Sequence, residues 1–472
     1  MYGPQLIQAF HEFKAIWDPR WRMNPGKVVD PFAIVSNLRV GPDYQPPEVT
    51  AHFSYPEDGG SFTRATLRCV GVGTCRRRSS ESGVMCPSYM ATLEERHSTR
   101  GRARLLFEML RGDPITDRWQ SGAVEEALDL CLACKGCKSD CPVNVDMATY
   151  KAEFRAHHYR GRLRPRAAYS MGLIHEWSRL AAMVPAVSNA VFRAPGVSAL
   201  VKWAAGIAQE RAMPSYAGES FVQWFRSRRH SPGSKRVVLW PDTFNNYFRP
   251  ATAIAATRVL ETLGFAVTIP GRPLCCGRPL YDWGMLDRAK RGWRAIMDSL
   301  ARDIDEGTFV VGLEPACVSA FRDELIGLYP NDPRAKQLAQ QTLLFSEFVA
   351  RCAPDAPLPH IDRRALVQIH CHHHAVIKPD AEREMLDRLH LDYEIMRSGC
   401  CGMAGAFGFE AGKYAVSMKA AERVLLPRLR EALPGTLVLA NGFSCREQIE
   451  QGAGRRTLHI AELIANAWPS AA

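Results

Sequence analysis

The sequence has no long apolar run. Within its 472 residues, no uninterrupted apolar stretch reaches the roughly 18 residues that a membrane-spanning helix needs. Its first residues, MYGPQLIQAF, also lack the basic head and apolar stretch of a secretory signal. We therefore expect a cytoplasmic protein, and peripheral attachment to the inner face of a membrane stays open.

Common signatures of nucleotide and acyl chemistry are absent too. The sequence has no G-x-G-x-x-G opening a helix after a strand, no P-loop and no G-x-S-x-G. Nothing in it indicates a site for a flavin or a nicotinamide. The net charge of +11 favours nucleic acid or anionic membrane, but much of the positive charge lies near the first cysteines, where it would offset thiolates. Without a recognisable binding motif, we expect no nucleic-acid partner.

What the sequence does have is cysteine, fifteen in all. Because the cytosol is reducing, metal ligation or redox chemistry explains them better than a disulfide framework. Their distribution is uneven: seven lie between Cys69 and Cys141, none between residues 142 and 274, and eight after that. The first group therefore predicts a compact metal-binding module.

The strongest motif is the run Cys131-x2-Cys134-x2-Cys137-x3-Cys141-Pro142. This spacing is that of bacterial ferredoxins, in which three thiolates on a tight loop bind three corners of one [4Fe–4S] cluster. The alternative is a zinc site, but zinc sites typically pair two short C-x2-C knuckles across a long gap. We expect at least one [4Fe–4S] cluster here.

The earlier cysteines, in Cys69-x5-Cys75-x10-Cys86-Pro87, form a weaker motif. In ferredoxins the fourth cysteine of one run ligates the cluster of the other run. Cys86 would then complete the cluster of the later run, and Cys141 would join Cys69 and Cys75. Seven cysteines are one short of two complete sets, so the second cluster that we expect needs a three-cysteine site or another ligand. The alternative is a loop in which Cys69 and Cys75 are unligated.

From Arg236 onward the sequence alternates short apolar strands with helices, and the pattern occurs twice. Each copy contains a Cys-Cys-Gly triplet, Cys275-Cys276-Gly277 and Cys400-Cys401-Gly402, 125 residues apart. Alternating strands and helices predict parallel sheets, with functional residues at the carboxyl ends of the strands. The fold class is therefore mixed α and α/β: an α-helical ferredoxin-type module followed by two duplicated α/β domains.

The two copies offer different ligands. Copy one has Cys275, Cys276 and Cys317, with Asp242 and Glu314 where further ligands are expected. Copy two has four cysteines and a histidine run: Cys371, Cys400, Cys401 and Cys445, with His370, His372, His373 and His374. Copy two is the candidate for a third metal or cluster site, and copy one is a weaker candidate. Zinc bound with the histidines, or buried reduced thiols without a cofactor, stay open.

These motifs divide the chain. Residues 41–60 are rich in Pro, Gly and acidic residues and are typical of a linker, and residues 184–208 favour a core helix pair over a helix pair on a membrane surface. The expected parts are a terminal helix and tail at 1–50, the ferredoxin-type module at 61–150, a helical connector at 151–232, the first Cys-Cys-Gly domain at 233–352 and the second at 360–472.

Several stretches together resemble one family. RCVGVGTC, VMCPSYMAT, CLACKGCKSDCPVNVDMATYKAEF, LCCGRPLYDWGMLD, HCHHH and SGCCGMAGAFGFE are similar to the iron–sulphur half of FAD-linked D-2-hydroxyacid dehydrogenases, the D-lactate dehydrogenase and glycolate oxidase group. The repeats resemble the Cys-Cys-Gly domains of heterodisulfide reductase. AFHEFKAIWDPRWRMNPGKVVDP resembles the last helix and tail of the FAD-linked oxidase domain in single-chain members.

The resemblance implies an oxidoreductase in which flavin, on a missing or partner domain, oxidises a D-lactate, glycolate or 2-hydroxyglutarate type of substrate. This chain would pass the electrons to a quinone or cytochrome-type acceptor. In heterodisulfide reductase, a repeat that holds a noncubane cluster uses five cysteines, and both copies depart from that set. Copy one has cysteine at three of the five positions, with Asp242 and Glu314 at the other two, and copy two has cysteine at four, with Gly442 at the fifth. The alternative is a heterodisulfide-reductase-like thiol/disulfide catalyst, and a regulatory or scaffold remnant is a third hypothesis.

Overall fold

The computed structural model describes residues 2–36, 38, 40–41, 44–79, 83–229, 233 and 235–468. The chain divides into two compact units, Met1–Pro47 and Glu48–Ala472. All cysteines lie in the second unit, which holds the cysteine-rich module, the connector and both α/β halves.

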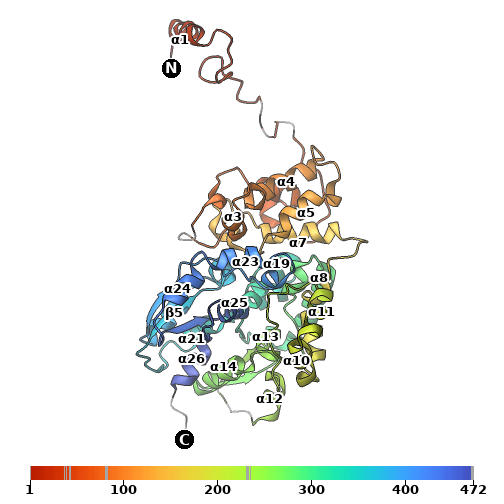
Figure 1. Ribbon diagram of the computed structural model, residues 1–472, viewed down its shortest axis with the longest axis vertical. Helices are drawn as coiled ribbons and strands as arrows, with labels where there is room; N and C mark the ends of the chain where they lie inside the picture. The colour runs from red at the N-terminus through yellow and green to blue at the C-terminus, as the bar shows by residue number, and fades with distance from the viewer. Residues whose placement is uncertain are drawn as a thin grey trace. The chain divides into compact units, whose positions relative to one another are not determined.

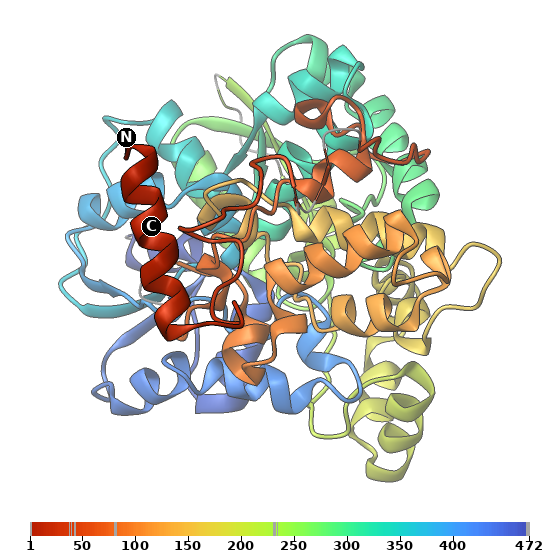
Figure 2. The same ribbon diagram turned by 90° about the horizontal axis from the view of Figure 1, so that it is seen from above.

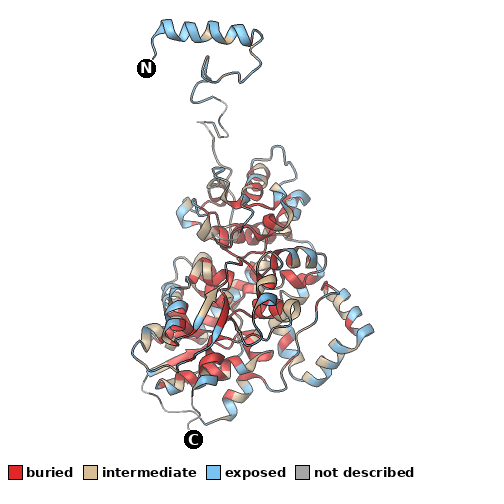
Figure 3. Cartoon of the chain, turned by 60° about the vertical axis from the view of Figure 1, so that its left-hand side comes forward, coloured by how far each residue is buried: buried red, intermediate tan, exposed pale blue. Residues whose placement is uncertain are grey.

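The first unit contains the predicted terminal helix, α1 (Pro4–Trp17). Proline at its first position suits the helix start, because the missing N–H would have no intrahelical partner there. Beyond its end, the Asp18 carboxylate accepts the backbone N–H groups of Arg22 and Met23, which turns the chain. None of the helix residues is buried, and Figure 3 shows the helix in the colour of exposure.

The expectation of a linker over residues 41–60 is wrong for its second half. Phe53 and Tyr55 are buried in the core of the second unit. The backbone N–H groups of His52 and Phe53 donate to the Glu153 carboxylate at 2.9 to 3.1 Å. Aromatic residues and a buried carboxylate therefore fix this stretch against the cysteine-rich module.

The cysteine-rich module is helical, as predicted. Its helices are α2 (Phe62–Leu67), α3 (Pro87–Thr92), α4 (Thr99–Arg111), α5 (Gly122–Asp129), α6 (Gly136–Asp140) and α7 (Met147–His158). Ser61, Ser98 and Ser121 cap α2, α4 and α5 by accepting a backbone N–H three residues on. Asp146 caps α7 in the same way. These caps fix where each helix begins and hence where the cysteine loops between them run.

The connector consists of α8 (Arg166–Ser170), α9 (Ile174–Ala181), α10 (Pro185–Arg193), α11 (Pro195–Ala205) and α12 (Phe221–Ser227). The expectation of a core helix pair over residues 184–208 is wrong, because α10 has no buried residue and α11 has only Ser198. Figures 1 and 2 show these two helices at the margin of the second unit. Both helices are apolar on the side that no other described element covers.

The first α/β half has a parallel four-stranded sheet in the order β2-β1-β3-β4, with Val237 opposite Val267 and Val238 opposite Val310. The strands are β1 (Lys235–Leu239), β2 (Phe265–Thr268), β3 (Val310–Gly312) and β4 (Thr342–Leu344). Its helices are α13 (Thr243–Tyr247), α14 (Pro250–Thr262), α15 (Arg278–Asp282), α16 (Leu286–Ser299), α17 (Ala301–Asp305), α18 (Pro315–Arg322), α19 (Glu324–Leu328), α20 (Pro333–Gln341) and α21 (Phe345–Cys352).

The second half repeats the arrangement with a parallel sheet in the order β6-β5-β7. Its strands are β5 (Arg364–Gln368), β6 (Asp392–Ile395) and β7 (Leu437–Ala440), and its helices are α22 (Asp380–Arg388), α23 (Tyr414–Ala421), α24 (Leu425–Glu431), α25 (Phe443–Ala453) and α26 (Ile460–Ala467). The order matches β2-β1-β3, so the predicted duplication holds in topology. One apolar core includes Val237 and Leu239 of the first sheet and Val367 and Leu439 of the second.

Among the described residues, no helix combines the length and apolar character needed to cross a membrane.

Candidate functional site

The later cysteine run lies on a buried loop between α5 and α7. Cys131, Cys134 and Cys137 are each less than a tenth exposed. Burial raises the pKa of Cys134 well above its usual value, and the charges of Cys371, Cys137 and Cys131 add to this. The backbone N–H of Met147 donates to Cys137 Sγ at 3.3 Å. Thiols that destabilise one another's charge in a buried loop are a donor set that a metal cluster would neutralise.

The loop before Cys86 packs directly on this run. A Cβ atom at Gly136 would lie 2.6 Å from Val84 Cγ2, so only glycine fits where α6 begins. The Asp140 carboxylate accepts the N–H groups of Val84 and Met85 at 2.7 and 3.0 Å. Burial opposes ionisation of Asp140, but bonds from His374, Ser139 and Arg77 hold its pKa below the usual value. Asp140 therefore joins the loop before Cys86 to the run that ends at Cys141.

Cys75 and Cys86 lie together at the start of α4. The N–H of Arg100 donates to Cys75 Sγ at 3.3 Å, and the N–H of Thr99 donates to Cys86 Sγ at 3.1 Å. A hydrogen bond from Cys86 lowers the pKa of Cys75 to about 6, against the effect of burial and with help from the Arg100 N–H. The structure thus places Cys86 against Cys75, and the assignment of Cys86 to the later run stays a prediction.

An internal comparison locates the missing eighth cysteine. The earlier motif reads Cys69-x2-Val72-x2-Cys75, so Val72 stands at the position that Cys134 occupies in the later run. Val72 is exposed, and Cys69 is only partly buried. The earlier group is therefore a three-cysteine version of the same spacing, a signal that was present in the sequence but appears only when the two runs are aligned.

In the first α/β half the predicted cysteines meet. Cys276 donates to Cys317 Sγ at 3.1 Å, and Cys317 lies in the first turn of α18, directly after β3. The carboxylates of Asp242 and Glu314, predicted near this site, cap α13 and α18 instead. Asp242 Oδ1 accepts the backbone N–H groups of Phe244 and Asn245, and Oδ2 accepts the side-chain amide of Asn245 at 2.8 Å, so both oxygen atoms are hydrogen-bonded.

Glu314 also joins the two halves. Besides capping α18, it accepts the N–H of Phe443 at 2.7 Å, at the start of α25. Burial, followed by the charge of Asp242, raises the pKa of Glu314 to about 8. Burial also raises the pKa of Asp242. Glu314 is therefore a poor anionic ligand at neutral pH.

In the second half all four predicted cysteines are buried and linked. Hydrogen bonds from Cys400 and Cys445 lower the pKa of Cys401 well below its usual value. Cys400 is in turn hydrogen-bonded to Cys371. Cys134, Cys371 and Cys400 belong to one buried cluster. The linked thiols of copy two, called the sulphur line below, therefore adjoin the ferredoxin-type run.

Two histidines flank the first cysteine of copy two. Ligand atoms of His370, Cys371 and His372 lie within 4.8 Å of one another. His372 Nε2 lies 3.1 Å from the Ala133 carbonyl, and among the described residues its buried Nδ1 has no hydrogen-bond partner. Burial lowers the pKa of His370 to about 4, so its ring is neutral at pH 7. Neutral imidazoles oriented by a carbonyl group are suited to bind a metal.

Gly442 explains why copy two has no fifth cysteine. A Cβ at this position would lie 2.3 Å from Cδ2 of His370, so the imidazole ring occupies the space of a side chain there. His374 points elsewhere, with Nε2 3.2 Å from Asp140 Oδ1, and His373 is buried. The remaining single thiol, Cys352, is the last residue of α21 and is partly buried.

Two buried cationic residues, Lys135 and Arg278, connect the ferredoxin-type run to the first α/β half. Lys135, between Cys134 and Cys137, forms ion pairs with Asp146, Asp323 and Glu324 at 3.2, 2.6 and 3.3 Å respectively. Arg278 Nη2 donates to the Ala133 carbonyl at 2.7 Å. It also lies 3.2 Å from His372 Nε2. Arg278 therefore contacts both the ferredoxin-type loop and copy two.

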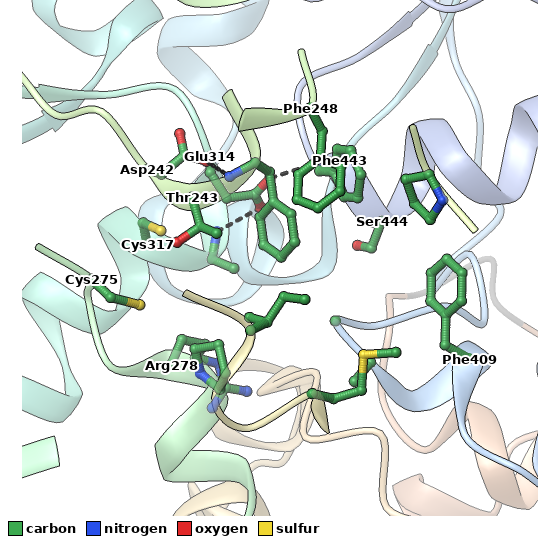
Figure 4. A pocket seen from close by; sticks show the side chains of 18 of the residues that line it. Asp242, Thr243, Phe248, Cys275, Arg278, Glu314, Cys317, Phe409, Phe443 and Ser444 are labelled. Atoms are coloured by element: carbon green, nitrogen blue, oxygen red, sulfur yellow. Dashed lines mark hydrogen bonds between the residues drawn. The ribbon is translucent and has the colours of Figure 1, made fainter. Parts of the chain in front are cut away.

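Arg278 also lines a cavity between the two halves and the connector, shown in Figure 4. Its walls are mainly aromatic and aliphatic, and they include Phe192, Phe244, Phe248, Phe409, Phe443 and Met213. Cys275, Cys276 and Cys317 border it, together with Asp242, Thr243 and Glu314. Sequence motifs do not indicate this cavity, because its lining residues come from distant parts of the chain.

Comparisons with known proteins agree with this architecture. Residues 65–145 match the family described as 4Fe-4S dicluster domain, and residues 242–322 match the Cysteine-rich domain family. Combined with the buried ferredoxin-type run, these matches define an iron–sulphur protein of the oxidoreductase type with an electron-transfer role.

The relatives are dehydrogenases and iron–sulphur subunits. The chain is 25% identical to D-2-hydroxyglutarate dehydrogenase of Pantoea ananatis, over 98% of this chain and 49% of that protein. It is 27% identical to one of the subunits of the anaerobic glycerol-3-phosphate dehydrogenase of Escherichia coli, over 60% of this chain and 72% of that relative. It is 23% identical to the Glycolate oxidase iron-sulfur subunit of Escherichia coli, over 84% of this chain and 93% of that relative.

These relatives confirm the resemblance inferred from the sequence motifs. The chain spans about half the length of the D-2-hydroxyglutarate dehydrogenases that it matches. The mixed α and α/β fold, with a 4Fe-4S module ahead of a cysteine-rich domain, is also confirmed.

Proposed function

We propose that this chain is the iron–sulphur electron-transfer portion of a flavin-dependent 2-hydroxyacid dehydrogenase, with a substrate of the D-lactate, glycolate or 2-hydroxyglutarate type. The observation that carries the proposal is the buried run Cys131, Cys134 and Cys137, whose thiols adjoin the sulphur line of copy two. The similarity to dehydrogenases and iron–sulphur subunits supports it. FAD and the organic substrate belong to another domain or subunit in this proposal.

The residues fit the group that the family implies. A [4Fe–4S] cluster, when bound, supplies one-electron transfer. The chain's own residues hold the site: Gly136 allows close approach of the loop before Cys86, Asp140 fixes that loop, and Lys135 anchors the run to α18 and α19. Buried thiols and apolar neighbours exclude water from the loop.

For the ligand sets, we keep the assignment of Cys131, Cys134, Cys137 and Cys86 to one cluster. Cys69, Cys75 and Cys141 would form a second, three-cysteine site. The line Cys371, Cys400, Cys401 and Cys445, with His370 and His372, is the third metal site that we propose, and its unpartnered His372 nitrogen supports a metal there. In copy one, Asp242 and Glu314 cap helices, so only the thiols of Cys275, Cys276 and Cys317 remain as candidate metal ligands.

The partner in this proposal is an FAD-containing oxidase domain or subunit, and α1 supports it. Leu6, Phe13 and Ile16 on this helix are between half and three-quarters exposed. An amphipathic helix with an apolar face normally packs against another element. The acceptor in this proposal is a quinone or cytochrome-type carrier. The chain itself is cytoplasmic and is attached peripherally to the inner face of the membrane.

Cluster content tests the proposal directly. We expect anaerobically purified protein to contain iron and sulphide and to give an EPR signal on reduction. Cys131→Ser should lose about four iron atoms per chain, because it removes a ligand of the complete run. Cys352→Ser is the matched control and should lose none. Colourless, iron-free protein, or zinc alone at these thiols, would contradict the proposal.

A thiol/disulfide catalyst of the heterodisulfide reductase type is the second candidate, favoured by the hydrogen-bonded thiols Cys400, Cys401 and Cys445. It predicts disulfide reduction by the reduced chain, lost in Cys401→Ser. The electron-transfer proposal predicts no such activity. Measuring disulfide reduction by wild type and variant separates the two.

A further inference from the structure

The cavity beside Cys275 has an apolar wall and a polar end. Aromatic rings surround it, with Phe244 stacked on Phe443 at 4.5 Å and Tyr216 stacked on Phe248 at 4.5 Å. Figure 4 shows Arg278, Thr243 and Cys275 on the side opposite Phe409 and Phe443. Such a lining suits a flat ring with a polar edge better than a small charged acid.

The polar end has an unused donor. Arg278 is only 7% exposed, and among the described residues no acceptor is hydrogen-bonded to its Nε. Thr243 also lines the cavity, and its Oγ1 lies 3.0 Å from His175 Nδ1. A buried donor without a partner is costly, so a carbonyl oxygen in the cavity would stabilise Arg278.

The cavity is also next to the redox centres of the proposal. Its wall includes Cys275, Cys276 and Cys317. One side chain separates it from the ferredoxin-type loop, because Arg278 both lines the cavity and donates to the Ala133 carbonyl between Cys131 and Cys134. A ligand here would therefore lie close to the thiols that hold the cluster.

The connector that forms one wall has an apolar outer surface. Ile174 of α9 and Phe192 of α10 line the cavity. The apolar residues that α9, α10, α11 and the turn between α9 and α10 expose are Trp177, Leu180, Met183, Val184, Val187, Val197, Leu200 and Trp203. Between residues 160 and 209 the chain has seven basic residues and one acidic residue. Apolar helices with basic flanks fit the surface of an anionic membrane.

We propose that this cavity binds the head group of a membrane quinone, which reaches it from the lipid along α9–α11. The inference rests on the proposed function and adds the identity and the site of the acceptor. The overall reaction balances: a 2-hydroxyacid loses two electrons and two protons to become a 2-oxoacid, and the quinone takes up two electrons and two protons to become a quinol. Arg278 and Thr243 would donate hydrogen bonds to one quinone carbonyl.

Other occupants fit less well. Arg278 is the one cationic residue in the described lining, and it is already paired with Asp282 at 2.8 Å. The carboxylate of a 2-hydroxyacid would also face the acidic residues Asp242 and Glu314 of the same lining. A cytochrome is a folded protein and would dock on the surface, leaving the cavity empty. A cytochrome acceptor therefore predicts that filling the cavity has no effect. A 2-hydroxyacid predicts that filling the cavity weakens binding of the acid and leaves the response to decyl-ubiquinone unchanged.

Filling the cavity tests the proposal with the full chain. Ala406→Trp places a large ring in the wall, and Ala411→Trp adds the same ring at an exposed position five residues on. Calorimetric titration with decyl-ubiquinone should show binding to wild type and Ala411→Trp, and binding at least about tenfold weaker to Ala406→Trp. If Ala406→Trp does not fold, Met213→Trp serves as the second cavity variant, because Met213 also lines the cavity. It should show the same weaker binding of decyl-ubiquinone.

The kinetic test uses pre-reduced protein. Decyl-ubiquinone should re-oxidise Ala406→Trp at least about tenfold more slowly than wild type, whereas ferricyanide should re-oxidise both at similar rates. Equal binding and equal re-oxidation of wild type and both cavity variants would overturn the quinone site. Protein without reducible iron would instead contradict the proposed function, and the titration would still decide the cavity.

Discussion

Replacing Lys135 by methionine should destabilise the protein strongly, because it leaves three buried or partly buried carboxylates without their cation. The Lys135 side chain is 1% exposed and forms ion pairs with Asp146, Asp323 and Glu324. Its Nζ also lies 5.6 Å from the ring centre of Tyr281. Burial disfavours the charged amine, but the three carboxylates outweigh this and raise its pKa. Lys135→Met keeps the length of the side chain and leaves those carboxylates without their buried cation.

Removing one partner of a buried ion pair costs about 3–5 kcal/mol. Unfolding entropy near the midpoint is about 2.1 cal/mol/K per residue. For the roughly 425-residue second unit unfolding as one body, this is about 0.9 kcal/mol/K, so we expect the Tm to fall by about 3–6 °C. Differential scanning calorimetry of the anaerobic, cluster-containing protein measures the change.

Lys138→Met is the matched control. Lys138 contacts two of the same carboxylates, Asp146 and Asp323, but its side chain is 40% exposed. Solvent screening limits such a pair to about 1 kcal/mol or less, so the Tm should fall by about 1 °C. Equal shifts for the two variants would refute the conclusion that the buried position of Lys135 makes it the anchor of the loop.

The stability of Lys135→Met should also depend on pH differently from that of the wild type. Burial opposes ionisation of Asp146 and Asp323, yet Lys135 and Lys138 lower the pKa values of both. A carboxyl group with a lowered folded-state pKa stabilises the protein above its unfolded pKa, and this stabilisation is lost as the pH falls through the folded pKa. Without Lys135 the two pKa values rise. The deficit of Lys135→Met should therefore be largest at neutral pH and smaller near about pH 4.

Three further predictions concern the cluster site and the connector. Asp140→Asn should lower iron retention after desalting, because it removes the charge that pairs with Arg77 and fixes the loop before Cys86; iron per chain equal to wild type would contradict this role. Val72→Cys should add about one iron per chain to a three-cysteine site, and an unchanged iron content would contradict a three-iron cluster at the earlier group. Leu200→Glu should weaken binding to anionic liposomes by about tenfold or more. A leucine that becomes buried in the membrane contributes about 1.5–3 kcal/mol to the binding free energy. Leu433→Glu, at an exposed leucine outside the connector, should leave liposome binding unchanged.

The local patterns predicted most of the elements. Alternating apolar runs indicated the parallel strands, and the two Cys-Cys-Gly triplets identified a duplication whose sheet orders β2-β1-β3 and β6-β5-β7 agree. Cysteine spacing identified the ferredoxin-type run. These features could be predicted because they depend on residues that are close together in the sequence. Strand periodicity and the cysteine spacing of a cluster loop are both set within a few residues.

The features that were mispredicted depend on contacts over long sequence distances. The stretch around Phe53 looked like a linker because its partner, Glu153, lies about a hundred residues away. The helices α10 and α11 looked like a core pair because apolar composition alone does not say whether another element covers a helix. The cavity at Arg278 could not be predicted for the same reason.

Asp242 and Glu314 show how the two copies differ. In copy one these carboxylates cap helices, accept backbone N–H groups and face the cavity. In copy two the corresponding region holds four linked thiols, and Gly442 makes room for the His370 ring. Copy two therefore places the side chains of the third metal site that we propose beside the ferredoxin-type run. Copy one has Asp242 where copy two has Cys371, and Glu314 where copy two has Gly442. These two carboxylates cap helices and border an apolar space.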